Sequence, residues 1–382
     1  MKKRALLTSF TIMIACSLLA SFLLVQQLSH PKEPVIAKAA ASHKPRSFQT
    51  IQHDFIPKIT IAAIGDILIH SQLYRDAFNG ASYDFNPMFQ QVQPMLQRPD
   101  ILTANQESLL GGVELGLSGY PMFNSPHQVA DVLQANGIDI ISNANNHTLD
   151  RGEKGIKSEA EYLNSIGMPY VGSFIDKPDQ HTLRIIEKSG VRLAFLSYTY
   201  GTNGNKVPKG KDYLVNVINR DKMSQEIDRA KAEADVVILS IHWGVEYQRN
   251  PTKQQKELAR FLANKGVDII FGSHPHVLQP MEWILRDDGR KTFIVYSLGN
   301  FLSAQTGQYK DIGGMASIDI SLAKSDTGTA VELTNPVFYS TYVTKINNHY
   351  RIVPLEAAAS TGLPNAVAKN NEIQEHMVQW LR

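Results

Sequence analysis

Cysteine is nearly absent from this sequence: Cys16 is the only one in 382 residues. A single cysteine excludes an intramolecular disulfide and a zinc site built from several thiolates. A chain of this length can bury a core that is stable without such cross-links, so the shortage does not reveal the redox compartment.

An excess of charge of either sign is also lacking. The chain has 38 Lys and Arg residues and 36 Asp and Glu residues, a net charge of +2, and no basic stripe interleaved with aromatic residues. We therefore expect no nucleic-acid partner. Apolar residues make up 43% of the chain and charged residues 19%, which is the composition of a globular protein and not of a disordered one.

An apolar run is present at the start of the chain. Residues 1–4 are basic after Met1 and residues 5–25 are mostly apolar, about the 20 residues that a helix needs to cross a bilayer. We expect a cytoplasmic basic end and a transmembrane signal anchor, with a single pass through the cell membrane and the bulk of the chain outside the cytoplasm. The alternatives are a signal peptide cleaved near Ala37-Lys38-Ala39 and a lipoprotein modified at Cys16, and both also export the chain.

The remainder divides into three regions. Residues 26–57 contain several prolines and no sustained periodicity, which predicts a linker or stalk. We expect one large domain over residues 58–345 and a C-terminal extension over residues 346–382, with a terminal helix from about Asn370 to Leu381.

Short apolar runs alternate with helical patterns from residue 58 onward. The runs lack polar–apolar alternation, as expected of strands buried on both faces, and they cover residues 59–64, 100–104, 138–142, 191–197, 235–240, 267–271 and 292–296. Capping residues and glycines predict helices at 125–137 and 252–265. This alternation predicts an α/β domain with covered sheets. Two β-like segments, 316–320 and 336–342, are expected to form a second sheet.

Polar side chains follow six of these strands at the point where each ends. In an open α/β fold, ligands bind in the crevice outside the carboxyl ends of the strands. The residues at these ends are Asp66 and His70; Asn105 and Glu107; Asn146, His147 and Asp150; His242 and Glu246; His274 and His276; and Asn300. Six such strand ends favour a functional site over chance loop polarity.

The side chains in this set suit divalent cations. Carboxylate, amide and imidazole donors without thiolate favour Mn, Fe or Zn, and two neighbouring cations need a carboxylate that can bridge them. We predict a site for two metal ions whose ligands are Asp66, Glu107, Asn146, His242, His274 and His276. In an extended loop, the H-x-H spacing of the last two would direct both rings to one side.

His147 adjoins one of these ligands and is the candidate catalytic residue, as a donor of a proton or hydrogen bond to a developing oxyanion. The possible supporting residues are His70, Asn105, Asp150, Glu246 and Asn300. Each residue also has a structural interpretation, since a lone histidine after a strand is more often a hydrogen-bonded loop residue and Gly65-Asp66 alone could cap a helix. Trp243 and Tyr247 are interpreted as packing residues.

Six sequence blocks at these strand ends carry a family resemblance. They are GDILIH at 65–70, NQE at 105–107, NANNHTLD at 143–150, HWGVEY at 242–247, GSHPHVLQP at 272–280 and YSLGNF at 296–301. In this order they resemble the CapA family of poly-γ-glutamate capsule proteins, which is in turn similar to calcineurin-like metallophosphoesterases. The resemblance implies a four-layer αββα sandwich over residues 58–345, with two metals at the strand ends.

The resemblance also implies individual roles. Carried over to this sequence, the pattern makes Asp66 the metal ligand of the first motif and Glu107 the bridging carboxylate, where Asp is usual. Asn146 and His147 would be the Asn–His pair, His242 the isolated histidine, and His274 and His276 the terminal pair. The first motif is usually D-x-H, whereas residue 68 here is Leu. One metal would therefore lack a ligand unless His70 supplies it.

The implied function is an accessory role in the synthesis, export or surface retention of poly-γ-glutamate, beside membrane-bound polyglutamate synthase components. The KVPKGK segment at 206–211 would contact the anionic polymer, although a solvated loop is the commoner explanation of such a cluster. The alternative is a metal-dependent hydrolase unrelated to capsule, which acts on a small-molecule phosphoester or on a γ-glutamyl or other peptide bond. A third possibility is a binding scaffold whose site is a relic.

Overall fold

The computed structural model describes residues 58–325 and 328–381. The predicted basic end, signal anchor and stalk at residues 1–57 lie outside these described residues. Within them, no helix combines the length and the apolar character that a membrane crossing requires.

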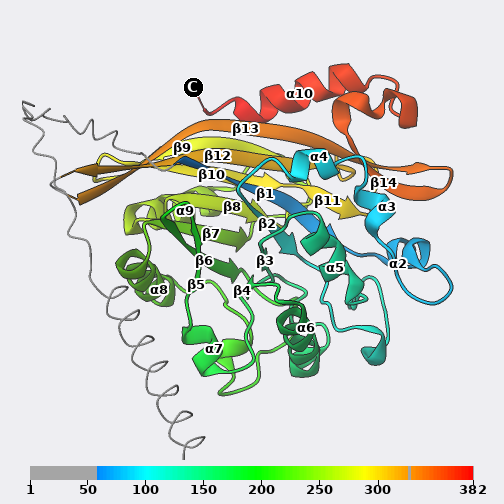
Figure 1. The fold of residues 1–382 in the computed structure, drawn as a ribbon, viewed down its shortest axis with the longest axis horizontal. Helices are drawn as coiled ribbons and strands as arrows, with labels where there is room; N and C mark the ends of the chain where they lie inside the picture. The colour runs from blue at the N-terminus through cyan, green and yellow to red at the C-terminus, as the bar shows by residue number, and fades with distance from the viewer. Residues whose placement is uncertain (1–57, 326–327, 382) are drawn as a thin grey trace, which may run out of the picture. The chain divides into compact units, whose positions relative to one another are not determined.

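Two β-sheets form the centre of the described domain (Figure 1). The first has eight strands, with the order β14-β13-β12-β1-β2-β3-β4 and β11 paired to β1. Its strands are β1 (Lys58–Leu68), β2 (Ile101–Gln106), β3 (Ile140–Ser142), β4 (Tyr170–Val171), β11 (Asn300–Ser303), β12 (Ile312–Ser325), β13 (Gly328–Ile346) and β14 (His349–Pro354).

The second sheet has six strands in the order β5-β6-β7-β8-β10-β9. They are β5 (Arg184–Lys188), β6 (Val191–Thr199), β7 (Val236–His242), β8 (Ile269–Ser273), β9 (Leu278–Leu285) and β10 (Lys291–Leu298). Strands β1 to β4 are parallel to one another, as are β6, β7, β8 and β10. In each sheet these strands therefore end at one edge, where side chains from separate parts of the chain can meet.

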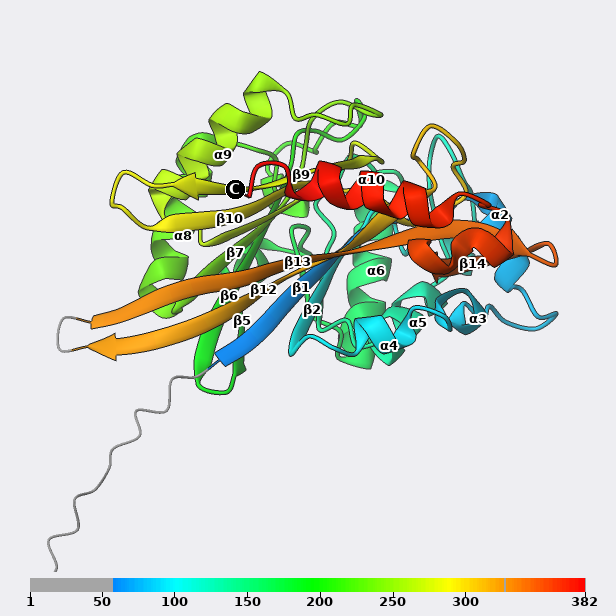
Figure 2. The same ribbon diagram turned by 90° about the horizontal axis from the view of Figure 1, so that it is seen from above.

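Helices cover the outer face of each sheet, which gives four layers. In β1, Ile59 and Ile61 face the apolar cluster between the sheets, whereas Ala62 and Ile64 face the helices outside. The first sheet is covered by α2 (Ser71–Ala77), α3 (Asn86–Phe89), α4 (Gln93–Leu96), α5 (Gln128–Ala135) and α6 (Gly152–Ile166). The second is covered by α8 (Arg220–Glu233) and α9 (Lys253–Lys265). Figure 2 shows these layers in succession.

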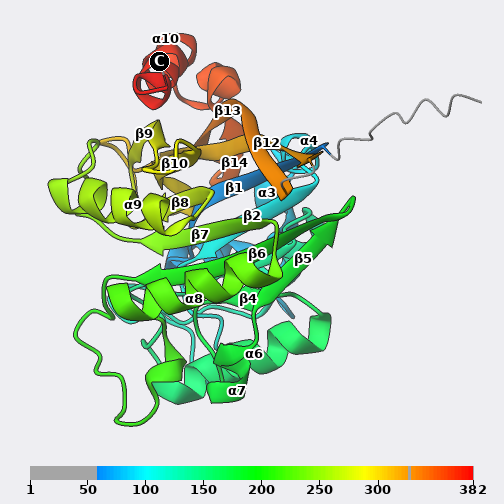
Figure 3. The same cartoon turned by 90° about the vertical axis from the view of Figure 1, so that its left-hand side faces the viewer.

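The C-terminal part of the chain packs on the same body. Strand β14 pairs with β13, and the 3-10 helix η3 (Leu355–Thr361) and helix α10 (Ala366–Val378) follow it. Ile373 and Met377 of α10 belong to the cluster between the sheets. The helix lies over β9 and β13 (Figures 1 and 3). The sheet thus continues beyond residue 345. A further short helix, α7 (Lys177–His181), precedes β5.

The predicted α/β fold with covered sheets is confirmed, and one assignment within it is wrong. Segments 316–320 and 336–342 do not form a second sheet but belong to the long strands β12 and β13. Strand β12 pairs antiparallel with β1, Ile59 opposite Ile320, and so extends the first sheet. The second sheet instead consists of β5 to β10.

The predicted helix at 252–265 is present as α9. Thr252 is its N-cap in a capping box with Gln255, and Gly266 ends it with a left-handed φ of 106°. The helix expected at 125–137 begins later, at Gln128. The C-terminal helix begins earlier than expected, at Ala366, and ends at Val378.

Candidate metal centre

The ligand candidates of the first sheet lie on adjacent strands. Asp66 in β1 is aligned with Asn105 of β2 on one side and Asn300 of β11 on the other. The backbone N–H of Asp66 donates to the carbonyl of Gly299 at 2.8 Å. A Cβ at the preceding residue, Gly65, would lie 2.0 Å from that carbonyl oxygen, so only glycine permits this approach.

The candidates of the second sheet come from β7 and the turn after β8. His242 ends β7 beside Ser273 of β8, and its Nδ1 lies 3.0 Å from the Ser273 hydroxyl. His274 and His276 have φ values of 95° and 58°. The prediction of an extended H-x-H loop is therefore wrong, because both residues lie in a turn with left-handed backbone. Such backbone is costly for non-glycine residues and is typical of functional sites.

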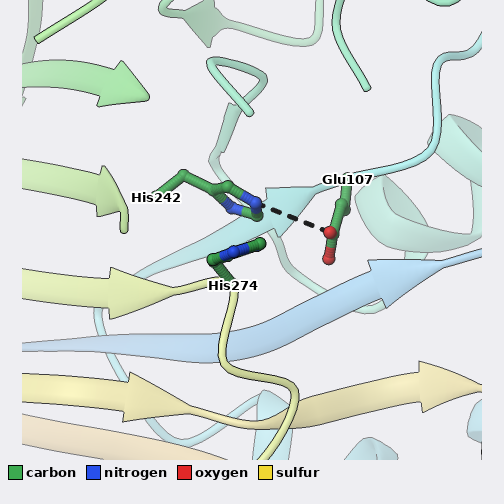
Figure 4. A group of neighbouring side chains, drawn as sticks. All are labelled: Glu107, His242 and His274. Atoms are coloured by element: carbon green, nitrogen blue, oxygen red, sulfur yellow. Dashed lines mark ion pairs between the residues drawn. The ribbon is translucent and has the colours of Figure 1, made fainter. Parts of the chain in front are cut away.

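The two sheets bring these side chains into three overlapping groups whose potential ligand atoms lie within 4.8 Å of one another. The groups are Glu107, His242 and His274; Asp66, Glu107 and His276; and Glu246, His274 and His276. Glu107, His274 and His276 each belong to two of them, and of these three only Glu107 is a carboxylate, the group that can bridge two cations. Figure 4 shows the first group, in which Nε2 of His242 lies 3.5 Å from Oε1 of Glu107.

Amide side chains complete this cluster. Oδ1 of Asn146 lies 2.8 Å from Nε2 of His242, so both atoms face the same point as Glu107. Nδ2 of Asn105 donates to Oδ1 of Asp66 at 2.8 Å. Nδ1 of His276 lies 3.2 Å from Oδ2 of Asp66 and 3.1 Å from Oδ1 of Asn300. Asn105 and Asn300 thus orient candidate ligands, in agreement with a supporting role.

The surroundings of the Glu107 carboxylate show whether a cation would fit this arrangement. Its carboxylate is fully buried, and neither oxygen has a hydrogen-bond partner in the part of the chain that the structure describes; the same holds for Nδ1 of His274. Burying a carboxylate without a hydrogen-bond partner costs on the order of several kcal/mol. A divalent cation would remove this cost, since carboxylate oxygen and imidazole nitrogen are its ordinary donors. The residues fit such an ion.

Burial and nearby charges shift the pKa values of the ligand candidates in different directions. Burial raises the pKa of Glu107 well above its usual value. Burial also lowers the pKa of His242 well below its usual range and that of His274 to about 3. Both imidazoles are therefore neutral at pH 7, which is the form that binds metal. For His276, burial opposes the charge, but the nearby carboxylates of Glu107 and Asp66 outweigh it and raise the pKa to about 9.

The candidate catalytic residue, His147, is held by a carboxylate. Its Nδ1 lies 2.7 Å from Oδ2 of Asp150, which also accepts the backbone N–H of Phe123 at 2.6 Å. The Phe123 ring packs edge-on at 4.6 Å between centroids. A histidine whose Nδ1 is fixed by a carboxylate presents Nε2 in a defined direction for proton transfer. Asp150 is therefore a positioning residue and not a member of the metal groups.

Two of the possible supporting residues, His70 and Glu246, differ in their position relative to the three groups. His70 lies in none of the three groups; its Nδ1 lies 3.1 Å from the carbonyl of Leu68 and its ring packs against Phe123. A role for His70 in place of the ligand that the resemblance expects at residue 68 stays a prediction. Glu246, expected only to support, instead reaches ligand distance of His274 and His276. The metal-binding roles themselves remain predictions.

Two aromatic residues beside the site differ from expectation. The Tyr200 ring lies 4.7 Å from His274 and stacks on His242 at 6.3 Å. It directly follows β6, and the sequence did not identify it because an aromatic residue after a strand is not a signal for a metal ligand. Tyr247 is not a packing residue, since it is 44% exposed and its ring lies 6.1 Å from His276. Trp243 is buried and packs on Tyr296, as predicted.

Comparison with known families decides the classification of this chain. Residues 60–305, more than half of the sequence, match the family described as bacterial capsule synthesis protein PGA_cap. The chain belongs to this family. All the candidate ligands lie within the matched residues.

Two similar proteins from Bacillus have names that refer to capsule or PGA biosynthesis. The chain is 28% identical over 293 residues to the capsule biosynthesis protein CapA of Bacillus anthracis, covering 74% of this chain and 67% of that protein. It is 29% identical over 250 residues to the PGA biosynthesis protein CapA of Bacillus subtilis, covering 63% and 62%. About a third of each relative therefore lies outside the match.

Two solved structures are distantly similar to this chain. The NAD nucleotidase NadN of Haemophilus influenzae is 14% identical with a TM-score of 0.47, covering 84% of this chain and 68% of that one. The calcineurin-like phosphoesterase YfkN of Bacillus subtilis is 16% identical with a TM-score of 0.46, covering 84% and 99%. Neither likeness is close enough to support an argument about activity.

Proposed function

We propose that this chain is a membrane-anchored, extracytoplasmic capsule protein that supports the synthesis, export or retention of poly-γ-glutamate through a divalent-metal centre. The observation that carries this proposal is Glu107, a buried carboxylate of the first sheet that has no hydrogen-bond partner in the described residues and that faces imidazoles of the second sheet. Family membership and the names of the two Bacillus relatives support the capsule role.

The centre would hold two ions of Mn, Fe or Zn. Asp66, Glu107 and His276 would hold one of them; Glu107, Asn146, His242 and His274 would hold the other. Glu246 is close enough to His274 and His276 to contribute. When bound, such ions supply Lewis-acid chemistry and a binding point for anionic groups.

The placement outside the cytoplasm rests on the sequence of the N-terminus. Residues 5–25 would anchor the chain in the cell membrane and residues 26–57 would act as a stalk. A polymer that leaves the cell has to pass this surface, so we propose membrane-bound polyglutamate synthase components as partners.

Deletion of the gene followed by complementation tests the capsule role. We expect loss or shortening of surface poly-γ-glutamate in the deletion strain, recovery with the full-length wild-type gene, and no recovery with Glu107→Gln. The amount and chain length of the polymer are measured on washed cells. Polymer of normal amount and length in the deletion strain would refute the proposal.

A second candidate function is a metal-dependent hydrolase without a role in capsule. The His147–Asp150 contact favours it, because a histidine oriented by a carboxylate is an arrangement suited to general acid–base catalysis. The test is a screen of the purified protein with Mn, Zn and Fe against phosphoesters and γ-glutamyl peptides. No turnover in any metal state would count against this function.

A further inference from the structure

One wall beside His276 is formed by the exposed Tyr247 and the half-buried Gln305 and Lys310. The Tyr247 ring lies 6.1 Å from the His276 ring, and Nζ of Lys310 lies 5.1 Å from the centroid of Tyr247. Nε2 of Gln305 donates to the Tyr247 hydroxyl at 3.4 Å. An ammonium group on an aromatic face is held in place without losing its charge.

The wall is fastened to the metal centre by Asn300. Nδ2 of Asn300 donates to Oε1 of Gln305 at 2.9 Å and to the backbone carbonyl of Lys310 at 2.8 Å. Oδ1 of the same side chain lies 3.1 Å from Nδ1 of His276. A single amide thus links a candidate metal ligand to the loop that carries the lysine.

The same loop is fastened on its other side to α10. The Tyr309 hydroxyl donates to Oε1 of Glu372 at 2.9 Å, and the guanidinium of Arg249 lies 3.8 Å above the Tyr309 ring. Tyr309 therefore holds the residue that follows it, Lys310, at a fixed position beside the site.

Left-handed backbone is concentrated at Tyr247 and in the loop that leads to Lys310. Tyr247, Gln308 and Tyr309 have φ values of 66°, 50° and 65°, and the Tyr247 N–H donates to the carbonyl of Pro275 at 2.7 Å. Each such non-glycine residue costs about 1 kcal/mol or more and persists where the surroundings require it. Strain that places an exposed tyrosine and a lysine next to a candidate metal centre indicates a binding role.

The charge of Lys310 is uncompensated. In the described part of the chain, its ammonium takes part in no ion pair, whereas the nearby Lys369 is paired with Glu372 and Lys211 with Glu153. A free cation beside a site for divalent cations is unfavourable by itself, and an anion that contacts both removes the repulsion.

We propose that Lys310 is a specificity-determining residue that pairs with a carboxylate of a chain-like polycarboxylate, next to the group held at the metal centre. The inference rests on the proposed function and names how its ligand is selected. The Tyr247 ring would contact the methylene groups of the same residue of the ligand.

The test compares two synthetic ligands with the same γ-linked backbone, γ-linked pentaglutamate and γ-linked pentaisoglutamine, in which each free α-carboxylate is replaced by a neutral amide. Their binding to the Mn-loaded, full-length protein is measured by titration calorimetry. We expect wild type to prefer pentaglutamate, and Lys310→Ala to weaken pentaglutamate binding by about fivefold, the upper end for an exposed ion pair. Binding of pentaisoglutamine should not change, and Lys310→Arg should retain the preference.

Lys291→Ala is the matched control. Its Nζ lies 6.0 Å from the Trp283 ring at the start of β10, whereas the metal centre lies beyond the end of that strand. This variant removes the same charge and should bind both ligands like wild type. Equal loss in Lys291→Ala and Lys310→Ala would reduce the effect to net charge and overturn the inference.

Unchanged pentaglutamate binding by Lys310→Ala, or no pentaglutamate binding by wild type, also overturns it. The proposed function is judged separately, by the metal content of the same preparations and by the polymer on deletion cells. The inference can therefore fail while the metal centre and the capsule role stand.

Discussion

Glu107 is the residue on which the site depends most. Without a cation its buried carboxylate accepts no hydrogen bond in the described residues, and burial outweighs the imidazoles of His242 and His276 at 3.5 and 3.7 Å, so a neutral side chain of the same shape should be better tolerated. We expect Glu107→Gln to raise the melting temperature of the metal-free protein by roughly 2–4 °C for each kcal/mol gained. The same variant should lose the stabilisation that Mn or Zn gives to wild type, about 3 kcal/mol at a hundredfold excess over Kd. Differential scanning calorimetry with and without EDTA measures both, and a metal-dependent shift that survives in the variant would contradict the assignment.

His147 should behave differently from the ligands, because it contacts Asp150 and lies in none of the potential metal groups. If the protein hydrolyses a substrate, His147→Ala should reduce kcat by about 10²–10⁴-fold. Its metal content should stay that of wild type, whereas His242→Ala should lose metal. Activity and elemental content are measured on the same samples. Loss of metal in His147→Ala would make this residue a ligand.

At the scale of elements, helix α6 holds two ligand-bearing loops together through Glu159. Oε1 of Glu159 accepts the backbone N–H of Leu110 at 3.2 Å, and Oε2 accepts from Asn143 at 3.4 Å. These residues lie on the loops that follow β2 and β3. Burial raises the pKa of Glu159 from 4.5 to about 7.

The raised pKa predicts the sign of a pH effect. Between pH 4.5 and about 7 the unfolded chain releases the Glu159 proton while the folded protein keeps it, so the free energy of unfolding falls as pH rises. Below this window the contribution is complete, and above it the loss is constant, at most about 3 kcal/mol. Glu159→Gln cannot titrate and should give a flatter dependence. Urea unfolding of both proteins across this range measures the difference; parallel curves would show that Glu159 does not titrate there.

The strand cores could be predicted because strands buried on both faces are unbroken apolar runs. Their ends could not, because polar residues continue a strand without any hydrophobic signal. Strand β7 runs on to His242 and β1 to Leu68, so two ligand candidates assigned to loops lie in strands. The pairing of the strands could not be predicted either, because β12 pairs with β1 although more than 240 residues separate them in the chain (Lys58 lies opposite Ser321). Periodicity indicates a strand but does not indicate its neighbour.

The candidate ligands could be named from residue type and position, but their geometry could not. His274 and His276 adopt left-handed backbone, and Gly272 just before them lies so close to β10 that a Cβ would be 2.0 Å from the Tyr296 carbonyl oxygen. The ligand-distance approach of Glu246 depends on the path of the loop after β7. Such features arise from tertiary packing, which local sequence does not encode.

For the whole molecule, the centre joins two sheets that contribute ligands from residues 66 to 276. A bound cation would therefore stabilise the packing of one sheet on the other, and the stability of the domain should depend on metal concentration. In the proposed anchored protein this centre would lie outside the cytoplasm, where Lys310 would contact the polymer.

Elemental analysis of the purified full-length protein tests the central claim most directly. Wild type is measured beside a His274→Ala/His276→Ala variant, after identical dialysis and with circular dichroism as the check on folding. We predict that wild type retains Mn, Fe or Zn in stoichiometric amount, up to two ions per chain, and that the folded variant has lost them. Equal metal content in the two proteins, or only trace metal in wild type after growth with all three metals, would contradict a metal centre at these strand ends.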